Sequence, residues 1–194
     1  MSFYKDKFKT DSIRLKNWDY SSETVYFITI VTKNRECLFG SIEDDKMILN
    51  EKGRIIETEL LKSIKIRENW FFHNGVIMPN HIHLLIEIQN GNISNNDLES
   101  TTHIVEAYGS APLRDNRDEK KSESNLGRQP NSISSFVAIF KSITTKQING
   151  SESIWQANYH DHLVKNYKRF ETIYSYIKNN PRSWETDSIN SKFQ

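Results

Sequence analysis

The spacing of apolar side chains divides the first half of the chain into strands and one amphipathic helix. Residues 23–32, ETVYFITIVT, are dense in β-branched and aromatic side chains, which favours a strand. After a turn-rich stretch, residues 49–66 carry Ile56, Leu60 and Ile64 at every fourth position, which predicts a helix with Asn50 as its N-cap. Residues 70–77 and 81–88 are two further apolar runs with a short connection, which indicates an antiparallel pair of strands.

The second half begins with a change of character and then returns to regular patterns. Residues 89–130 are polar and long for a loop within a domain, so we expect an inserted segment that is mobile. A helix is predicted to begin near residue 131, and its apolar face consists of Ile133, Phe136, Val137, Phe140 and Ile143. Residues 155–164 fit a short extended segment, and residues 167–180 fit a closing helix that Pro181 ends. This order predicts an α+β fold, an antiparallel sheet with helices packed on one face.

Length and composition are those of one globular domain. We expect a basic N-terminal arm over residues 1–22, a single domain over 23–88 and 131–184 with the insertion 89–130, and a C-terminal tail over 185–194. The single cysteine, Cys37, excludes an intramolecular disulfide framework and a cysteine-based zinc cluster, which fits a reducing cytoplasm. The sequence contains no apolar run long enough to cross a bilayer and no visible signal peptide. The net charge of +1 is a weak hint of a nucleic-acid partner. The two basic ends of the chain, on either side of a neutral middle, could hold phosphates, and solvated surface charges explain them equally well.

Two histidines in the third predicted strand are candidate metal ligands. Side chains alternate along a strand, so His81 and His83 project from one face while Ile82 projects from the other. Two imidazoles at that spacing can converge on one divalent ion, but two ligands are too few for a tight site. Two hydrogen-bonded histidines at the end of a sheet are an equally good interpretation.

The closing helix offers a third ligand and a nucleophile. Tyr176 and Asn180 are four residues apart and therefore share a helix face. The Asn180 carbonyl suits a hard cation such as Mg²⁺ or Mn²⁺, and a phenol beside such an ion suits phosphoryl transfer. Spacing alone does not select Tyr176, because Tyr167 with Glu171 has the same spacing and Tyr174 lies in the same helix.

Three motifs, taken together, resemble a known family. The run Val76-Ile77-Met78-Pro79-Asn80-His81-Ile82-His83-Leu84-Leu85 resembles the histidine–hydrophobic–histidine signature of single-tyrosine HUH transposases. The segment IWQANYHDH at 154–162, followed by YIKNNP at 176–181, is similar to the C-terminal half of their REP-associated branch. The first strand and the following Asn34-Arg35 are also similar, so the resemblance covers most of residues 12–88 and 131–184.

The resemblance implies a ferredoxin-like fold, a homodimer and a metal-dependent DNA transposase. It implies that His81, His83 and Asn180 bind Mg²⁺ or Mn²⁺ and that Tyr176 attacks a phosphodiester of hairpin-containing single-stranded DNA. The product is a 5′-phosphotyrosine link that is later rejoined without a nucleotide cofactor. A bacterial cytoplasmic, nucleoid-associated location follows from this implied function. The long polar insertion departs from the family's pattern and is either a DNA-recognition element or a sign of a domesticated role.

Further residues are candidates for DNA contacts, and two other functions stay open. The candidates for phosphate contacts or base stacking are Lys141, Lys165, Lys168, Arg169, Lys178, Arg182 and Tyr159. His160 and His162 could imitate a second metal pair, but we expect them to lie near the site without ligating. The first alternative function is a hairpin-DNA-binding regulator without turnover. The second, a small RNA-binding module, has little support from the aromatic residues of the first strand.

Overall fold

Four antiparallel strands form the main sheet of the computed structural model, which describes residues 24–89 and 131–190. The strands are β1 (Thr24–Val31), β4 (Trp70–Met78), β5 (His81–Ile88) and β6 (His160–Val164), and they lie side by side in the order β4–β5–β1–β6. Helix α1 (Glu51–Lys65) connects β1 to β4, and α3 (Ile133–Asn149) precedes β6. This βαββαβ order is the ferredoxin-like arrangement, which confirms the predicted α+β class.

Side chains at the helix starts explain where two helices begin. The Asn50 side chain accepts a hydrogen bond from the Gly53 amide at 2.9 Å, which is the predicted N-cap of α1. At the start of α3, Ser132 and Ser135 form a capping box in which each side chain binds the other residue's backbone amide. A side chain at Gly53 would collide with the Phe39 carbonyl oxygen, because an added Cβ would lie 2.2 Å from it.

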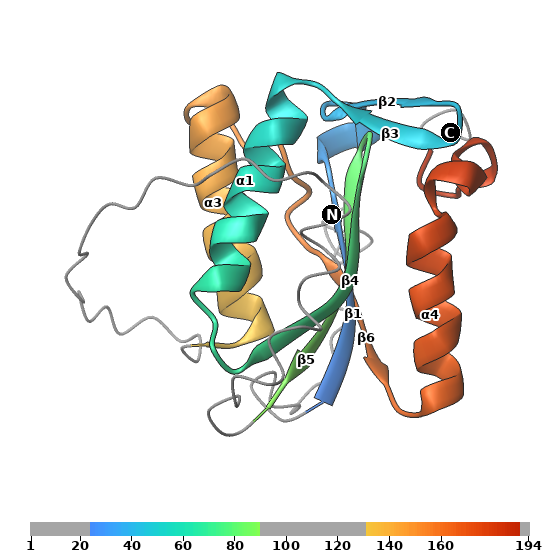
Figure 1. Cartoon of the computed structure of the whole chain (residues 1–194). Coiled ribbons are helices and arrows are strands. Elements are labelled where there is room, and N and C mark those ends of the chain that lie inside the picture. Colours follow the sequence, from blue (N-terminus) through green and yellow to red (C-terminus); the bar gives the residue numbers. More distant parts are fainter. Residues whose placement is uncertain (1–23, 90–130, 191–194) are drawn as a thin grey trace, which may run out of the picture.

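Helices cover both faces of the sheet, in contrast to the predicted packing on one face. Helices α1 and α3 lie against one face, and α4 (Tyr167–Asn179) lies against the other (Figure 1). Apolar periodicity predicts that a helix has a buried side but does not say which face of a sheet it covers. The inward residues of α4, Ile173 and Ile177, pack with Val76, Met78 and Leu85 on the face that also carries the two histidines.

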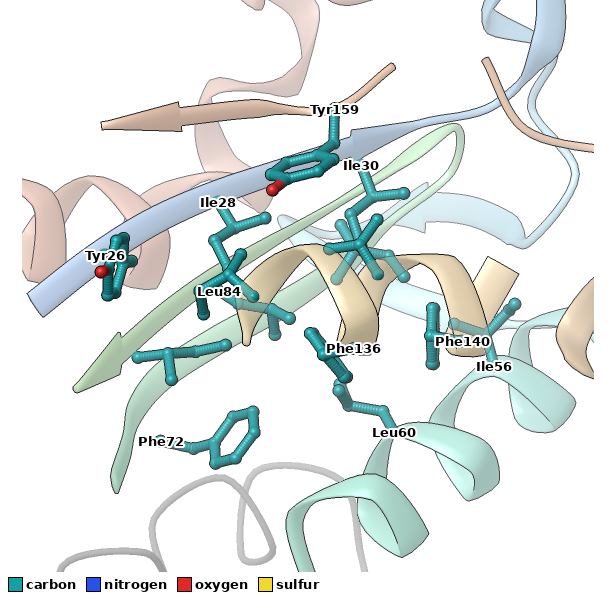
Figure 2. Close-up of a cluster of buried hydrophobic side chains, with 14 of the residues drawn as sticks. Tyr26, Ile28, Ile30, Ile56, Leu60, Phe72, Leu84, Phe136, Phe140 and Tyr159 are labelled. Carbon is teal, nitrogen blue, oxygen red and sulfur yellow. The ribbon is translucent and has the colours of Figure 1, made fainter. Parts of the chain in front are cut away.

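The larger core lies on the opposite face, between the sheet and helices α1 and α3 (Figure 2). Its residues from β5, which are Ile82, Leu84, Ile86 and Ile88, alternate with those of the histidine face, and Ile82 lies on the face that the sequence predicted. Phe136 and Phe140 of α3 fill the space above them, whereas Ile143 at the end of the predicted face is 39% exposed. The main core is thus built on the side of the sheet away from the histidines.

Smaller elements complete the described structure. A two-stranded hairpin, β2 (Gly40–Glu43) and β3 (Lys46–Leu49), occupies the stretch predicted as turns and takes Leu49 from the predicted helix. A short 3₁₀ helix, η2 (Lys33–Arg35), follows β1, and another, η4 (Pro181–Thr186), follows α4. No helix in the described ranges is long and apolar enough to span a membrane.

Some predicted segments fall partly or wholly outside the described residues. The basic arm, 1–22, lies outside them, as does the insertion 89–130 apart from Gln89. Of the predicted tail, 185–194, only residues 185–190 are described, and these pack against the domain. Asp187 and Asn190 in this segment are 7% and 1% exposed, so the packed region continues beyond residue 184.

Candidate active site

Strand β5 holds both histidines on the α4 side of the sheet. His83 lies opposite Thr29 of β1 and Val76 of β4, and His81 lies opposite Val31 and Met78. The two rings lie at a centroid distance of 4.5 Å and are 0% and 2% exposed for His81 and His83. Strand alternation therefore brings the two imidazoles together, as the sequence predicted.

Neighbouring side chains fix which nitrogen of His81 can bind a ligand. The Asn80 side-chain nitrogen donates to the backbone carbonyls of Arg35 and Ile189, at 3.0 and 2.9 Å, so its amide oxygen must face His81. That oxygen is 2.8 Å from His81 Nδ1, and an amide oxygen only accepts, so Nδ1 carries the proton. The Nε2 atom of His81 is then the one with a free lone pair.

His83 has a comparable partner in the adjacent strand. Its Nδ1 lies 2.8 Å from the Thr29 hydroxyl, and its Nε2 lies 3.2 Å from the Tyr176 hydroxyl. If Nδ1 donates to Thr29, Nε2 accepts from the phenol, and both hydrogen bonds are satisfied. This arrangement leaves the same nitrogen, Nε2, directed into the site in both histidines.

Helix α4 brings Tyr176 and Asn180 to the histidines of the same chain. The rings of Tyr176 and His83 lie 5.3 Å apart at a steep angle, and Phe27 packs edge-on against Tyr176. Tyr176 is 41% exposed, so its ring is accessible from solvent, while Asn180 is fully buried at the C-terminal end of the helix. The four residues that the sequence selected lie together, whereas Tyr174 packs among apolar side chains and Tyr167 is 73% exposed.

Two buried acceptor atoms in the site have no hydrogen-bond partner among the described residues. These are His81 Nε2 and Asn180 Oδ1. Burying such an atom without a partner costs about 1–3 kcal/mol, and coordination of a cation by these two atoms would offset that cost. An amide oxygen is a ligand that Mg²⁺ and Mn²⁺ prefer, and neutral imidazole is the commonest side-chain ligand of divalent metals, so these residues fit a divalent ion of the kind that the sequence suggested.

Asp187 is a site residue that the sequence analysis missed. Its carboxylate accepts from Asn180 Nδ2 at 3.1 Å and from the Ile189 amide at 2.8 Å. One of its oxygens and one ring nitrogen from each of His81 and His83 all lie within 4.8 Å of one another. The sequence offers no signal that separates Asp187 from nearby Glu185, because the chain reversal through η4 determines which carboxylate turns inward.

Burial sets the protonation of the site. It lowers the pKa of His81 to about 4, although the Asp187 carboxylate and the Asn180 amide act in the opposite direction. Burial and the neighbouring His81 hold the pKa of His83 well below its usual value. Both imidazoles are therefore neutral near pH 7, which is the form that binds a metal. Burial first, and then Asp187, raise the pKa of Tyr176, so the phenol is protonated in the metal-free protein.

A pocket of about 490 Å³ opens beside Tyr176 and His83. Its polar lining includes His160, His162 and Arg169, and its apolar lining includes Phe27 and Ile173. His160 lies opposite Thr29 across the β1–β6 pairing, so it projects from the same sheet face as His83. The two exposed histidines of β6 thus line the same pocket as His83 and Tyr176.

The other sequence candidates for DNA contacts divide into two groups. The exposed ones lie on α4, next to it or on η4: Lys165, Lys168, Arg169, Lys178 and Arg182. The Lys141 ammonium instead donates to the carbonyls of Gln156 and Asn158, each at 2.8 Å, and holds that loop. The Tyr159 ring is 6% exposed in the main core, so it has no free face for an unpaired base (Figure 2).

Solved structures with a similar fold include a transposase. The REP-associated tyrosine transposase bound to a REP hairpin superimposes with a TM-score of 0.54 over 88% of this chain and 74% of that chain, at 16% identity. The present chain therefore has the fold of that class of protein, the REP-associated tyrosine transposases. A structure described as a proposed transposase from Deinococcus radiodurans covers 86% of this chain and 95% of its own, at 13% identity and a TM-score of 0.30, too low to carry an argument.

A curated sequence relative identifies the family. The chain is 37% identical over 188 residues to an uncharacterized protein of Haemophilus influenzae, covering 92% of this chain and 91% of that protein. The chain belongs to the same family as this Haemophilus protein. No family model matches the sequence.

Proposed function

We propose that the protein is a tyrosine transposase that cleaves and rejoins hairpin-containing single-stranded DNA. The observation that carries the proposal is the convergence of a phenol, two neutral imidazoles and an amide in one chain. The Tyr176 hydroxyl is 3.2 Å from His83 Nε2, and the buried acceptors of His81 and Asn180 lack partners within the described structure. A site with these groups suits phosphoryl transfer better than a structural role.

The proposed ligands of the ion are His81, His83 and Asn180, and the ion is Mg²⁺ or Mn²⁺. When bound, such an ion supplies Lewis-acid polarisation of a phosphate oxygen and offsets its negative charge. The chain's own contribution is orientation: Asn80 and Thr29 keep Nε2 of each histidine directed into the site. Tyr176 Oη is the proposed nucleophile, since it is the partly exposed oxygen beside the imidazoles.

The proposed reaction is one transesterification that is later reversed. The Tyr176 oxygen forms a bond to phosphorus, and the bond from phosphorus to the 3′-oxygen breaks. The phenol loses a proton, and the leaving 3′-oxygen gains one. The products are a 5′-phosphotyrosine and a free 3′-hydroxyl, and attack by a 3′-hydroxyl on the phosphotyrosine restores a phosphodiester. The bond energy is conserved in the covalent link, so no nucleotide cofactor is required.

The pocket beside Tyr176 is the proposed entry for the strand to be cut. Its imidazoles and the Arg169 guanidinium suit a phosphate, and its apolar lining suits an unstacked base. The exposed basic residues of α4 and η4 add positive charge to the helix that carries Tyr176 and to the turn that follows it. The REP hairpin bound by the neighbouring structure suggests hairpin DNA as the partner. A homodimer and nucleoid association in a bacterial cytoplasm stay predictions.

The decisive experiment is capture of the covalent intermediate. A labelled single-stranded hairpin library is incubated with the protein and Mn²⁺, and denaturing gels reveal DNA that remains attached to protein. We expect Tyr176→Phe to abolish the adduct, while Tyr174→Phe, a matched change in the same helix, leaves it intact. His81→Ala should lose the adduct and keep most of its hairpin affinity. An adduct that survives Tyr176→Phe would refute the assignment of the nucleophile.

The alternative is a hairpin-binding regulator without turnover. It requires tight hairpin binding by the wild-type protein and no adduct at any Mn²⁺ concentration. The orphaned acceptors of His81 and Asn180 favour the enzyme, since a protein that only binds DNA gains nothing from them.

A further inference from the structure

Asp187 lies at the two imidazoles although it comes from the far end of the described chain. It is 7% exposed, and its nearest carboxylate oxygen and the two histidine nitrogens lie within 4.8 Å of one another. Ligand atoms that share an ion at about 2.1 Å each stand roughly 3.0 Å apart at neighbouring octahedral positions and about 4.2 Å apart at opposite ones. An inward movement of at most roughly 2 Å by these side chains therefore lets all three surround one ion.

The carboxylate also dictates how the neighbouring amide is turned. Carboxylate oxygens only accept hydrogen bonds, so the end of Asn180 that faces Asp187 at 3.1 Å must be its NH₂ group. The amide oxygen is thereby kept at the other end of the group, where it has no partner among the described residues. Asp187 thus leaves Asn180 with a free carbonyl oxygen.

Charge gives a third reason to expect a divalent ion beside Asp187. The other proposed ligands, two imidazoles and one amide, are neutral, so they cannot offset the charge of a divalent ion. Asp187 is a buried carboxylate, and no Lys or Arg within residues 24–89 and 131–190 forms an ion pair with it. A buried carboxylate without a cationic partner is costly, and a bound cation removes that cost.

We propose that Asp187 is the anionic ligand of the divalent-ion site and holds Asn180 ready to be its neighbouring ligand. This inference rests on the metal-dependent function proposed above and adds a residue to that site. It also assigns a role to the segment after α4, which returns through η4 to the β4–β5 turn, where the Ile189 carbonyl accepts from Asn80.

The first test measures Mn²⁺ binding to the full-length protein without DNA, by isothermal titration calorimetry. We expect Asp187→Asn, which preserves size and can still accept from Asn180, to weaken Mn²⁺ binding at least tenfold. Glu185→Gln removes the same charge from an exposed position two residues away and should bind Mn²⁺ like the wild type. Binding by Asp187→Asn within about twofold of the wild type would overturn the proposal.

The second test separates a ligand from a residue that only orients Asn180. It compares Asp187→Cys with its parent, and both proteins also carry Cys37→Ser because Cys37 is exposed and would bind soft metals. A thiolate at position 187 should transfer the preference of the site from Mn²⁺ to Cd²⁺. Asp187→Cys is therefore expected to show sulfur-to-cadmium charge-transfer absorption that the parent lacks. No such absorption would overturn direct ligation, and circular dichroism with and without Cd²⁺ checks the fold.

The two proposals fail in different ways. Wild-type protein that binds Mn²⁺ through Asp187 but forms no DNA adduct would refute the transposase function and leave the ion site standing. An adduct that forms normally in Asp187→Asn, with unchanged Mn²⁺ affinity, would refute the ion-site assignment and leave the transposase function standing.

Discussion

The metal-free protein should lose stability on mild acidification because His81 is buried in its neutral form. The pKa of His81 is lowered from 6.5 to about 4, so the unfolded chain takes up a proton at a higher pH than the folded chain does. This contribution favours folding above pH 6.5 and is lost progressively as the pH falls towards about 4. At about 1.4 kcal/mol per pH unit, the full loss is about 3 kcal/mol, and near pH 5 it is about 2 kcal/mol.

The assay is urea unfolding at about pH 7.5 and about pH 5 in the presence of a chelator, since a bound cation would itself hold the imidazoles neutral. The comparison is with His81→Gln, which cannot titrate. The wild type should lose about 2 kcal/mol more than His81→Gln between the two pH values. His160→Gln, a matched change at an exposed histidine of the same sheet face, should behave like the wild type. Equal acid losses in wild type and His81→Gln would refute the reasoning.

Three further changes test the framework of the site. Thr29→Val removes the partner of His83 Nδ1, so calorimetry should show Mn²⁺ affinity reduced about tenfold, with Thr29→Ser close to wild type. Asn80→Ala removes the three hydrogen bonds of a buried side chain and should lower the free energy of unfolding by about 3 kcal/mol in urea, whereas exposed Asn179→Ala should cost less than about 1 kcal/mol. Arg169→Gln should weaken hairpin binding, measured by fluorescence anisotropy, and should reduce the slope of log K against the logarithm of the salt concentration by about one. An unchanged slope would show that Arg169 does not contact a phosphate of the DNA.

Much of the site could be predicted because it depends on local periodicity. Alternation along β5 brings His81 and His83 to one face, and four-residue spacing along α4 aligns Tyr176 with Asn180. Residue spacing alone could not choose among the tyrosines of that helix, because it shows which residues share a helix face but not which residues that face contacts. The resemblance to a transposase family made that choice, and in the structure Tyr176 contacts His83.

The remainder depends on tertiary structure that no local pattern encodes. The hairpin β2–β3 has four residues in each strand, too few for a clear alternation. The side of the sheet on which α4 packs is decided by apolar residues of β4 and β5, such as Val76 and Leu85, that are distant in sequence. Asp187 becomes a neighbour of His81 only because the chain turns back after Pro181.

The short connection before α4 has a genetic consequence. Strand β6 ends at Val164 and α4 begins at Tyr167, and the three residue steps between them reach at most roughly 11 Å. The helix is thus tethered to the sheet of its own polypeptide, and each copy carries its own tyrosine to its own imidazoles. A cell that produces one copy defective at Tyr176 and another defective at His81 would not regain function by mixing them. Such alleles would fail to complement each other.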